Sequence, residues 1–418
     1  MRTGVTLSRM KKKFLIPLTV LVILTVVFSI HREPARTLTQ KELLGKKIFF
    51  DEALSDPEGM SCATCHDKRG GWAGPDSKIN KYTAVYPGIQ EPRFGNRKPP
   101  TAAYSGFSPK LYRDEEGNFV GGLFLDGRAT GWEIGDPLAE QAMGPFLNPL
   151  EQNLSAKKQL VEKIMEADYA PLFKEVFGED SLSLEKVDQV YEQAAIAIAP
   201  YERSFELNPF NSSFDDFWRK TVKAGLDVDK INQKNMVQYK NMGLTDQAVR
   251  GMMLFKTKGL CAECHLLGSE DGVPPLFTDF TYDNLGVPGN PKNPFYTQDK
   301  KINPLGDKWI DEGLGAFLRT TEKYKKYAAE NIGKYKVPTL RNIDMRESPD
   351  FVKSYMHNGY FTSLKDIVDF YNTRDLPERK WPPSEVGVNI NRDELGNLEL
   401  TDEEVDLIVL FLKTLSDQ

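Results

Sequence analysis

Two copies of one short motif contain all four cysteines of the chain. The motif is Cys-x-x-Cys-His, and it occurs at residues 62–66 and again at residues 261–265. This spacing is the attachment signature of a c-type haem. The two thiols can form thioether bonds to the vinyl groups on one edge of the porphyrin, and the imidazole beside them can ligate the iron. The sequence therefore predicts two covalent haems, the first held by Cys62, Cys65 and His66 and the second by Cys261, Cys264 and His265.

Other uses of four cysteines fit this pattern less well. A Cys-x-x-Cys pair is usually redox-active or a set of metal ligands rather than a structural disulfide. A four-cysteine zinc ribbon places its two pairs ~15–20 residues apart, whereas these pairs stand in different halves of the chain. Neither alternative explains why a histidine follows both pairs.

An amide and a carboxylate between the two motifs could carry out acid–base chemistry. Gln141 and Glu151 lie ten residues apart in a segment that we interpret as a loop, so both can face one haem. A buried carboxylate with a raised pKa can take a proton from peroxide and return it to the departing oxygen. A solvated or helix-capping Glu151 is the simpler alternative, and the residues alone leave both open.

Helix start signals precede each haem motif. Thr39 and Glu42 form a capping box that opens a helix ending near Phe49. Thr245 caps a second helix that runs to Lys256. Each motif is therefore expected to follow a helix, the first of them after a turn at residues 56–59.

Long loops are predicted after each motif, because glycine and proline are frequent in residues 70–109 and 268–306. Helices resume at residues 156–177 and 184–199, and Pro200 is expected to end the latter. The first loop is predicted to wrap over the haem.

The two halves of the chain repeat one layout. Residues 45–49 (Gly-Lys-Lys-Ile-Phe) precede the first motif, and residues 251–255 (Gly-Met-Met-Leu-Phe) precede the second. Each half closes with an amphipathic helix, at residues 187–199 and 405–415. Helix, motif, loop and closing helix are the layout of a small cytochrome c domain. The predicted fold is all-α, with two tandem cytochrome c-like haem domains and long loops, over residues 37–206 and 207–418.

The N-terminal segment, residues 1–36, has the pattern of an export signal. Basic residues precede an uninterrupted apolar run over residues 14–30. That run is long for a signal-peptide core, and no small-x-small cleavage site follows it. We therefore favour an uncleaved anchor in the inner membrane, with the rest of the chain on the periplasmic side, over a peptide that is cleaved on secretion to the periplasm. The net charge of −6 gives no sign of nucleic-acid binding.

The chain resembles the bacterial di-haem cytochrome c peroxidase family, which includes the MauG-type enzymes. The resemblance covers nearly everything after the N-terminal segment. It implies that hydrogen peroxide reacts at the first haem, with His66 below the iron and Gln141 and Glu151 in the active site. It also implies that the second haem, ligated by His265, stores and relays electrons. Besides the two haem motifs, it rests on four segments: residues 126–129, 141–151, 336–342 and 355–359.

Departures from the family pattern bear on the ligands of iron. Other members carry a histidine shortly after the first motif, but residues 67–86 contain none. The resemblance thus implies that the first haem is five-coordinate, or holds water, without reductive activation. Where many members place a methionine ligand of the second haem, this chain has Tyr371, as MauG-type enzymes do. Met356 is the rival ligand, and His357 is expected to hydrogen-bond near the haem.

Two further departures concern the space between the haems. The family often has a tryptophan where this chain has Leu125, so the usual aromatic bridge is missing; Trp132 is a candidate to replace it. The family's inter-haem calcium site usually involves an asparagine where this chain has Lys98. The resemblance implies calcium as a second cofactor, and Lys98 argues against it.

The leading hypothesis is a di-haem c-type peroxidase that reduces hydrogen peroxide. Its electrons would come from a small electron-donor protein. The first alternative is a MauG-type enzyme that uses peroxide to oxidise residues of a partner protein. The alternative from another class is a non-catalytic di-haem electron-transfer cytochrome, against which Gln141 and Glu151 argue.

Overall fold

The computed structural model describes residues 36–269 and 272–418. The apolar run at residues 14–30, predicted to be a membrane anchor or signal, lies outside the described residues. Within the described ranges, no helix has the length and apolar character needed to cross a membrane. Leu38–Gln418 forms one compact unit.

In the first half, the predicted closing helix is α6 (Val187–Glu202), and the other helices of that half pack around it. The predicted capping box at Thr39 and Glu42 is present at the start of α1. The long helix α6 packs against α1, α3 and α4. At the crossing of α1 with α6, a Cβ atom on Gly45 would lie 1.9 Å from the carbonyl oxygen of Ala197, so only glycine permits this approach. The α-helices of this half other than α2 are α1 (Gln40–Phe49), α3 (Pro137–Leu147), α4 (Lys157–Glu166), α5 (Ala170–Phe177) and α6 (Val187–Glu202).

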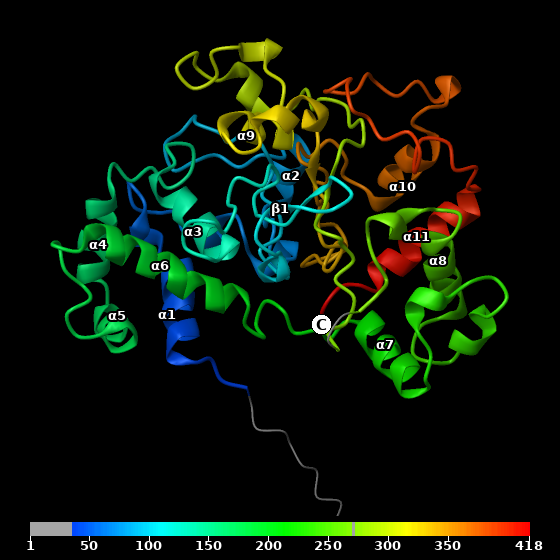
Figure 1. Cartoon of the computed structure of the whole chain (residues 1–418), viewed down its shortest axis with the longest axis horizontal. Coiled ribbons are helices and arrows are strands. Elements are labelled where there is room, and N and C mark those ends of the chain that lie inside the picture. Colours follow the sequence, from blue (N-terminus) through cyan, green and yellow to red (C-terminus); the bar gives the residue numbers. More distant parts are fainter. Residues whose placement is uncertain (1–35, 270–271) are drawn as a thin grey trace, which may run out of the picture. The chain divides into compact units, whose positions relative to one another are not determined.

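The second half repeats that crossing. Helix α8 packs against α11, and a Cβ atom on Gly251 would lie 2.0 Å from the carbonyl oxygen of Leu407. The predicted repeat of a glycine-bearing helix and a closing helix is therefore seen in the structure. In Figure 1 the first set of helices lies on the left and α7, α8, α10 and α11 lie on the right. The α-helices of this half are α7 (Ser213–Lys223), α8 (Asp246–Lys256), α9 (Gly313–Thr320), α10 (Leu364–Thr373) and α11 (Asp402–Lys413).

Loops and a few short elements join these helices. Antiparallel pairs form between β1 (Tyr112–Arg113) and β2 (Phe119–Val120), and between β3 (Tyr282–Asp283) and β4 (Tyr335–Lys336). The expected loop after the first motif contains the short helix α2 (Ser77–Tyr82). The described chain is thus helical with long loops, as predicted.

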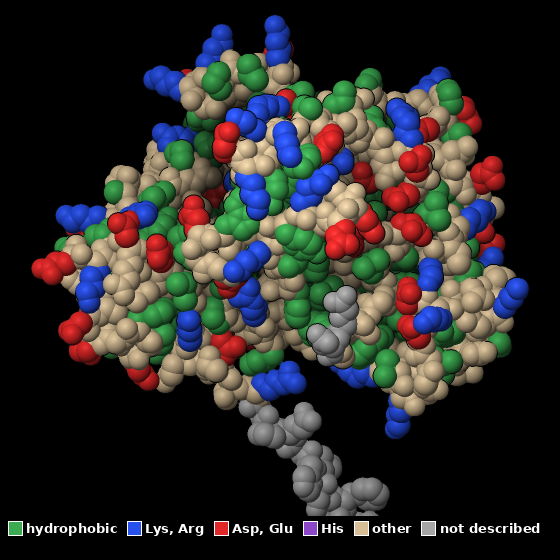
Figure 2. All heavy atoms as spheres, in the orientation of Figure 1, with side chains coloured by type: hydrophobic (Ala, Val, Ile, Leu, Met, Phe, Trp, Pro, Cys, Tyr) green, Lys and Arg blue, Asp and Glu red, His purple; other side chains and the backbone are tan. Residues whose placement is uncertain are grey.

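Two large hydrophobic clusters lie within the unit. One gathers side chains between Leu44 and Leu207, and the other gathers side chains between Phe214 and Leu415. Their boundary falls close to the predicted division between residues 37–206 and 207–418, which stays a prediction. Figure 2 shows basic and acidic side chains interspersed over one face, in keeping with the small net charge.

Two of the predicted helix boundaries were wrong. Pro200 does not end α6, which continues to Glu202. Tyr201 packs edge-on against Phe49 at 5.5 Å between ring centroids, and this contact holds the last turn although a proline there forfeits one backbone hydrogen bond. The single helix expected over residues 156–177 is two helices, α4 and α5, separated by a short turn.

Candidate active site

One cavity of about 470 Å³ is lined by both Cys-x-x-Cys-His motifs. Each motif forms a short 3₁₀ turn. The second motif follows closely on the end of α8 at Lys256, whereas the 3₁₀ turn Glu52–Leu54 and a further loop separate the first motif from the end of α1 at Phe49. The cavity wall also includes residues from α3, α6, β4 and α10, so both halves contribute to it. Residues 336–342, one of the segments that carry the family resemblance, line it along most of their length.

Both motif histidines are held in the same way. The Nδ1 atom of His66 lies 3.4 Å from the carbonyl oxygen of Trp72, and Nδ1 of His265 lies 2.8 Å from that of Phe277. A carbonyl partner fixes the proton on Nδ1 and leaves Nε2 as the free lone pair that a metal needs. Burial lowers the pKa of His66 to about 4 and also lowers the pKa of His265, so both rings are neutral.

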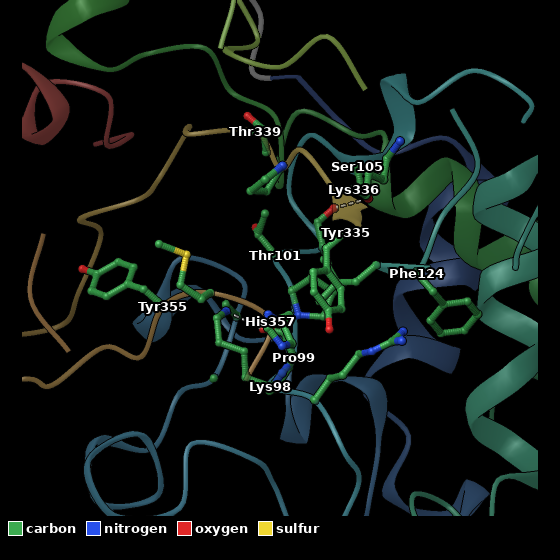
Figure 3. A pocket seen from close by; sticks show the side chains of 18 of the residues that line it. Lys98, Pro99, Thr101, Ser105, Phe124, Tyr335, Lys336, Thr339, Tyr355 and His357 are labelled. Carbon is green, nitrogen blue, oxygen red and sulfur yellow. Dashed lines mark hydrogen bonds between the residues drawn. The ribbon is translucent and has the colours of Figure 1, made fainter. Parts of the chain in front are cut away.

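The carbonyls that orient these histidines belong to a duplicated frame. Trp72 and Phe277 both have positive φ, at 60° and 54°. The hydroxyl of Thr101 donates to the carbonyl before Trp72, and the hydroxyl of Thr339 donates to the carbonyl before Phe277. Each threonine follows a proline, and Figure 3 shows both threonines beside the same pocket. The two halves therefore position their histidines with equivalent loops.

The residues at the two motifs fit c-type haems. All four cysteines are half-buried and line the cavity. Each pair lies at the wall of the cavity next to a neutral imidazole whose Nε2 is available. This donor set provides two thioether attachments and one iron ligand for each haem.

Gln141 and Glu151 line this cavity together with the first motif. The expectation that both lie in a loop was wrong for Gln141, which is on α3 because Asp136 caps that helix and Pro137 occupies its first position. Glu151 follows α3 in a turn, where the Asn148 amide donates to its Oε1 at 2.8 Å. Burial raises the pKa of Glu151, and Arg128 opposes that shift.

An ion network joins the Asp-Gly-Arg segment to the second half. Asp126 accepts from both Arg97 and Arg128 at 2.7 Å. The buried Arg97 also bonds Asp311 at 2.6 Å. Arg128 lies 3.6 Å from the ring centroid of Phe124, a residue that lines the cavity. The network fixes Arg128 at the cavity wall and links the first half to the loop before α9.

Tyr371 and Met356 both line the large cavity near the second motif. Tyr371 also lines a smaller cavity of about 60 Å³ together with Cys261 and His265, whereas Met356 does not. Among the described residues, no hydrogen bond reaches the Tyr371 hydroxyl, and burial is the main cause that raises its pKa.

His357 is held away from the role of an iron ligand. Its Nε2 lies 3.1 Å from Oε2 of Glu385, and its ring stacks on Tyr335 with centroids 3.7 Å apart. Figure 3 shows the two rings side by side in the pocket, with Lys98 close by. Leu125 lines the cavity, whereas Trp132 is 41% exposed and donates to the Leu111 carbonyl. Trp132 therefore does not replace the missing aromatic bridge.

Sequence reasoning considered Lys98 only for its bearing on calcium, and it missed Lys336 and Glu202 as charged groups of the cavity wall. Burial lowers the pKa of Lys98 to about 8 and that of Lys336 to about 7. Both precede the proline and threonine of the duplicated frame, and this repeated position was the signal that could have found them. Lys98 donates to the Pro99 carbonyl at 3.0 Å. Glu202, on the last turn of α6, also lines the cavity and gave no sequence signal.

Comparisons with known proteins agree with this geometry. A family described as di-haem cytochrome c peroxidase matches residues 39–223. The methylamine utilization protein MauG of Paracoccus denitrificans is 32% identical, over 90% of this chain and 88% of that protein. The cytochrome-c peroxidase IdrP1 of Denitromonas iodatirespirans is 26% identical, over 90% and 81%. The crystal structure of the diheme peroxidase BthA from Burkholderia thailandensis is 28% identical, with a TM-score of 0.70, and covers 91% of this chain and 87% of that one.

Proposed function

Because this chain belongs to the di-haem cytochrome c peroxidase family, we propose that it reduces hydrogen peroxide in the part of the cavity lined by Gln141 and Glu151. It is an oxidoreductase with two c-type haems. We propose that Gln141 and Glu151 are the residues that act on the peroxide. The observation that carries it is the buried Glu151 carboxyl in the same cavity as Cys62, Cys65 and His66.

Glu151 is proposed to move the proton of the peroxide. The haem held by His66 would supply the iron at which the O–O bond is cleaved. In its charged form, Glu151 would accept one proton of the peroxide and return it to the departing oxygen, which would leave as water. The overall change consumes one peroxide, two electrons and two protons and yields two waters. Burial raises the pKa of Glu151, so its carboxyl holds a proton more readily than an exposed glutamate does.

Neighbouring groups are proposed to orient Glu151 and the peroxide. Asn148 holds one carboxylate oxygen, so the other is free to face the substrate. The amide of Gln141 offers a donor and an acceptor from the rigid α3. Residues 67–86 contain no histidine and His357 is bound to Glu385, which supports an open position at the first iron.

Tyr371 is proposed as the second ligand of the iron held by His265. Tyr371 borders the small cavity beside that histidine, and its hydroxyl has no hydrogen-bond partner among the described residues. A phenolate stabilises oxidised iron and lowers its potential. Met356 remains the alternative, since it lines the larger cavity on the same side.

A second candidate function is the MauG-type use of peroxide to oxidise a partner protein. Tyr371 and the 32% identity to the MauG protein favour it. In either use the electrons come from another protein, and we propose that the chain works on the periplasmic side of the inner membrane, held there by residues 14–30. An electron-transfer cytochrome without a catalytic haem would have no use for the buried Glu151.

A spectroscopic titration tests the proposal. The purified ferric holoprotein should show one high-spin and one low-spin haem, and adding hydrogen peroxide should change the high-spin signal at once, without prior reduction. A spectrum with two low-spin haems and no response to peroxide would contradict the proposed function. Consumption of peroxide with reduced small cytochromes then separates peroxidase use from MauG-type use.

A further inference from the structure

A second buried carboxyl group faces the first haem site and has no part in the chemistry above. Glu202 is the last residue of α6, is 5% exposed and lines the cavity. It lies close enough to Cys62 that its charge raises the pKa of that thiol. Within the described part of the chain, no hydrogen bond or ion pair reaches its carboxylate. A polar group buried in this way without a partner is costly and points to a function.

The charged groups around Glu202 are already paired with one another. Arg203 forms a two-fold ion pair with Asp136, at 2.6 and 2.7 Å. Lys46 on α1 pairs with Glu206 at 2.7 Å. Neither cation forms an ion pair with Glu202, and Arg203 acts on its charge only from a distance while bound to Asp136.

The remaining titratable groups near α6 do not compensate Glu202 either. On α3, Glu140 accepts backbone N–H groups of residues 131, 133 and 134. On α4, Lys157 pairs with Asp188 at the opposite end of α6. Glu151 is the other carboxyl whose charge reaches Cys62, and Tyr201 precedes Glu202 in the helix with its pKa raised by burial. Burial is therefore the main cause that raises the pKa of Glu202, with a smaller contribution from the charge of Asp136 and an opposing one from Arg203.

A buried acid beside a redox centre responds to the charge of that centre. Adding an electron makes the neighbourhood more negative, which favours the neutral form of the acid. We propose that Glu202 takes up a proton when the first haem is reduced and releases it when that haem is oxidised. The step balances, because one electron enters the iron while one proton converts the carboxylate to the carboxylic acid. This role rests only on the attachment of a haem at residues 62–66 and not on the proposed reaction with peroxide.

Burial places this exchange in an accessible pH range. It raises the pKa of Glu202 to about 8, opposed by Arg203. Reduction should raise that pKa further and oxidation should lower it. At pH values between the pKa of Glu202 in the oxidised protein and its higher pKa in the reduced protein, each electron brings one proton with it. Peroxide reduction consumes protons and would find one stored beside the haem.

Redox titration of the holoprotein over a range of pH around 8 tests the proposal. One of the two haem couples should fall by up to ~59 mV per pH unit, the value for one proton per electron. In Glu202→Gln that couple should become independent of pH, while the other couple stays as it was. The matched control is Glu192→Gln, an exposed position on the same helix. Independence of pH in the unaltered protein, or a slope that survives in Glu202→Gln, would overturn the assignment.

Infrared difference spectra give a second readout that needs no turnover. Reduction should produce a carbonyl band of a protonated carboxyl group that shifts in D₂O and is absent in Glu202→Gln. Glutamine has nearly the same shape, and no described side chain loses a hydrogen bond in this variant, so haem content should be retained. A band that remains in Glu202→Gln but disappears in Glu151→Gln would assign the proton to Glu151 and refute the role of Glu202.

Discussion

The two haem sites use one frame for two different sets of side chains. In both, a backbone carbonyl orients the motif histidine, and the carbonyl just before it accepts a hydrogen bond from the threonine of a Pro-Thr segment. In both, a glycine-mediated crossing of two helices also packs within the same half. In the first site, Gln141 and Glu151 come from α3 and its following turn. In the second site, Tyr371 comes from α10, and Asp283 and Glu394 lie beside Cys264.

This difference between the two sites arises from the helix that lies between the haem motif and the closing helix of each half. Helix α3 packs against α6 in the first half, whereas α10 packs against α11 in the second. Each inserted helix contributes to the wall of the haem cavity, and its polar side chain there is Gln141 on α3 and Tyr371 on α10. Duplication therefore accounts for haem attachment, and the inserted helices account for the proposed division into an open reactive site and a closed relay. Four predictions follow from that contrast.

The largest expected effect is on the reaction with peroxide. Glu151→Gln should slow it by ~10²–10⁴, the usual contribution of a general acid–base group. Because burial raises the pKa of Glu151 and the charged form accepts the proton, the rate in the unaltered protein should fall as pH drops through that pKa. Stopped-flow mixing with peroxide measures the rate and its dependence on pH. The fall of the rate at low pH should be absent in Glu151→Gln.

The matched control for that variant is in the other site. Glu394 is a half-buried carboxyl next to Cys264. Glu394→Gln should leave the rate with peroxide within about twofold, because a general acid–base group must reach the reacting proton. Equal losses in the two variants would mean that the sites are not divided as proposed.

Tyr371→Phe should change the spectrum of the second haem. Removing the hydroxyl takes away the proposed ligand, so the low-spin ferric signal should be replaced by a high-spin one. Electron paramagnetic resonance of the ferric protein measures this directly. Met356→Leu is the control and should keep the low-spin signal; if the signal is instead lost in Met356→Leu and kept in Tyr371→Phe, methionine is the ligand.

The shared frame can be tested through its two glycines. Gly45→Ala and Gly251→Ala each place a Cβ atom within about 2 Å of a backbone carbonyl oxygen, at 1.9 and 2.0 Å. Each should lower the free energy of unfolding by ~1–3 kcal/mol, the usual cost of overpacking. Thermal or denaturant unfolding of the holoprotein measures the change. A loss at one glycine only would show that the two crossings are not equivalent.

The sequence predicted the shared frame better than it predicted the differences. Haem attachment depends on adjacent residues, so the spacing of cysteine and histidine was sufficient, and the capping box at Thr39 could be recognised for the same reason. Gln141 was placed in a loop because its helix is short and contains Pro145. Glu202 was missed because its burial depends on α6 continuing through Pro200 to meet α1, a tertiary contact that local patterns do not show.

The smallest expected effect concerns calcium. Lys98 carries its ammonium group at the position where the family resemblance would place a calcium ligand, and its Nζ donates to the Pro99 carbonyl. A lysine offers no lone pair when charged and repels a divalent cation. Exhaustive treatment with a chelator should therefore leave both the melting temperature and the rate with peroxide unchanged. Lys98→Asn restores a neutral oxygen donor, so only this variant should gain stability when calcium is added. If chelation lowers the melting temperature of the unaltered protein, a cation binds despite Lys98, and the second cofactor implied by the resemblance is present.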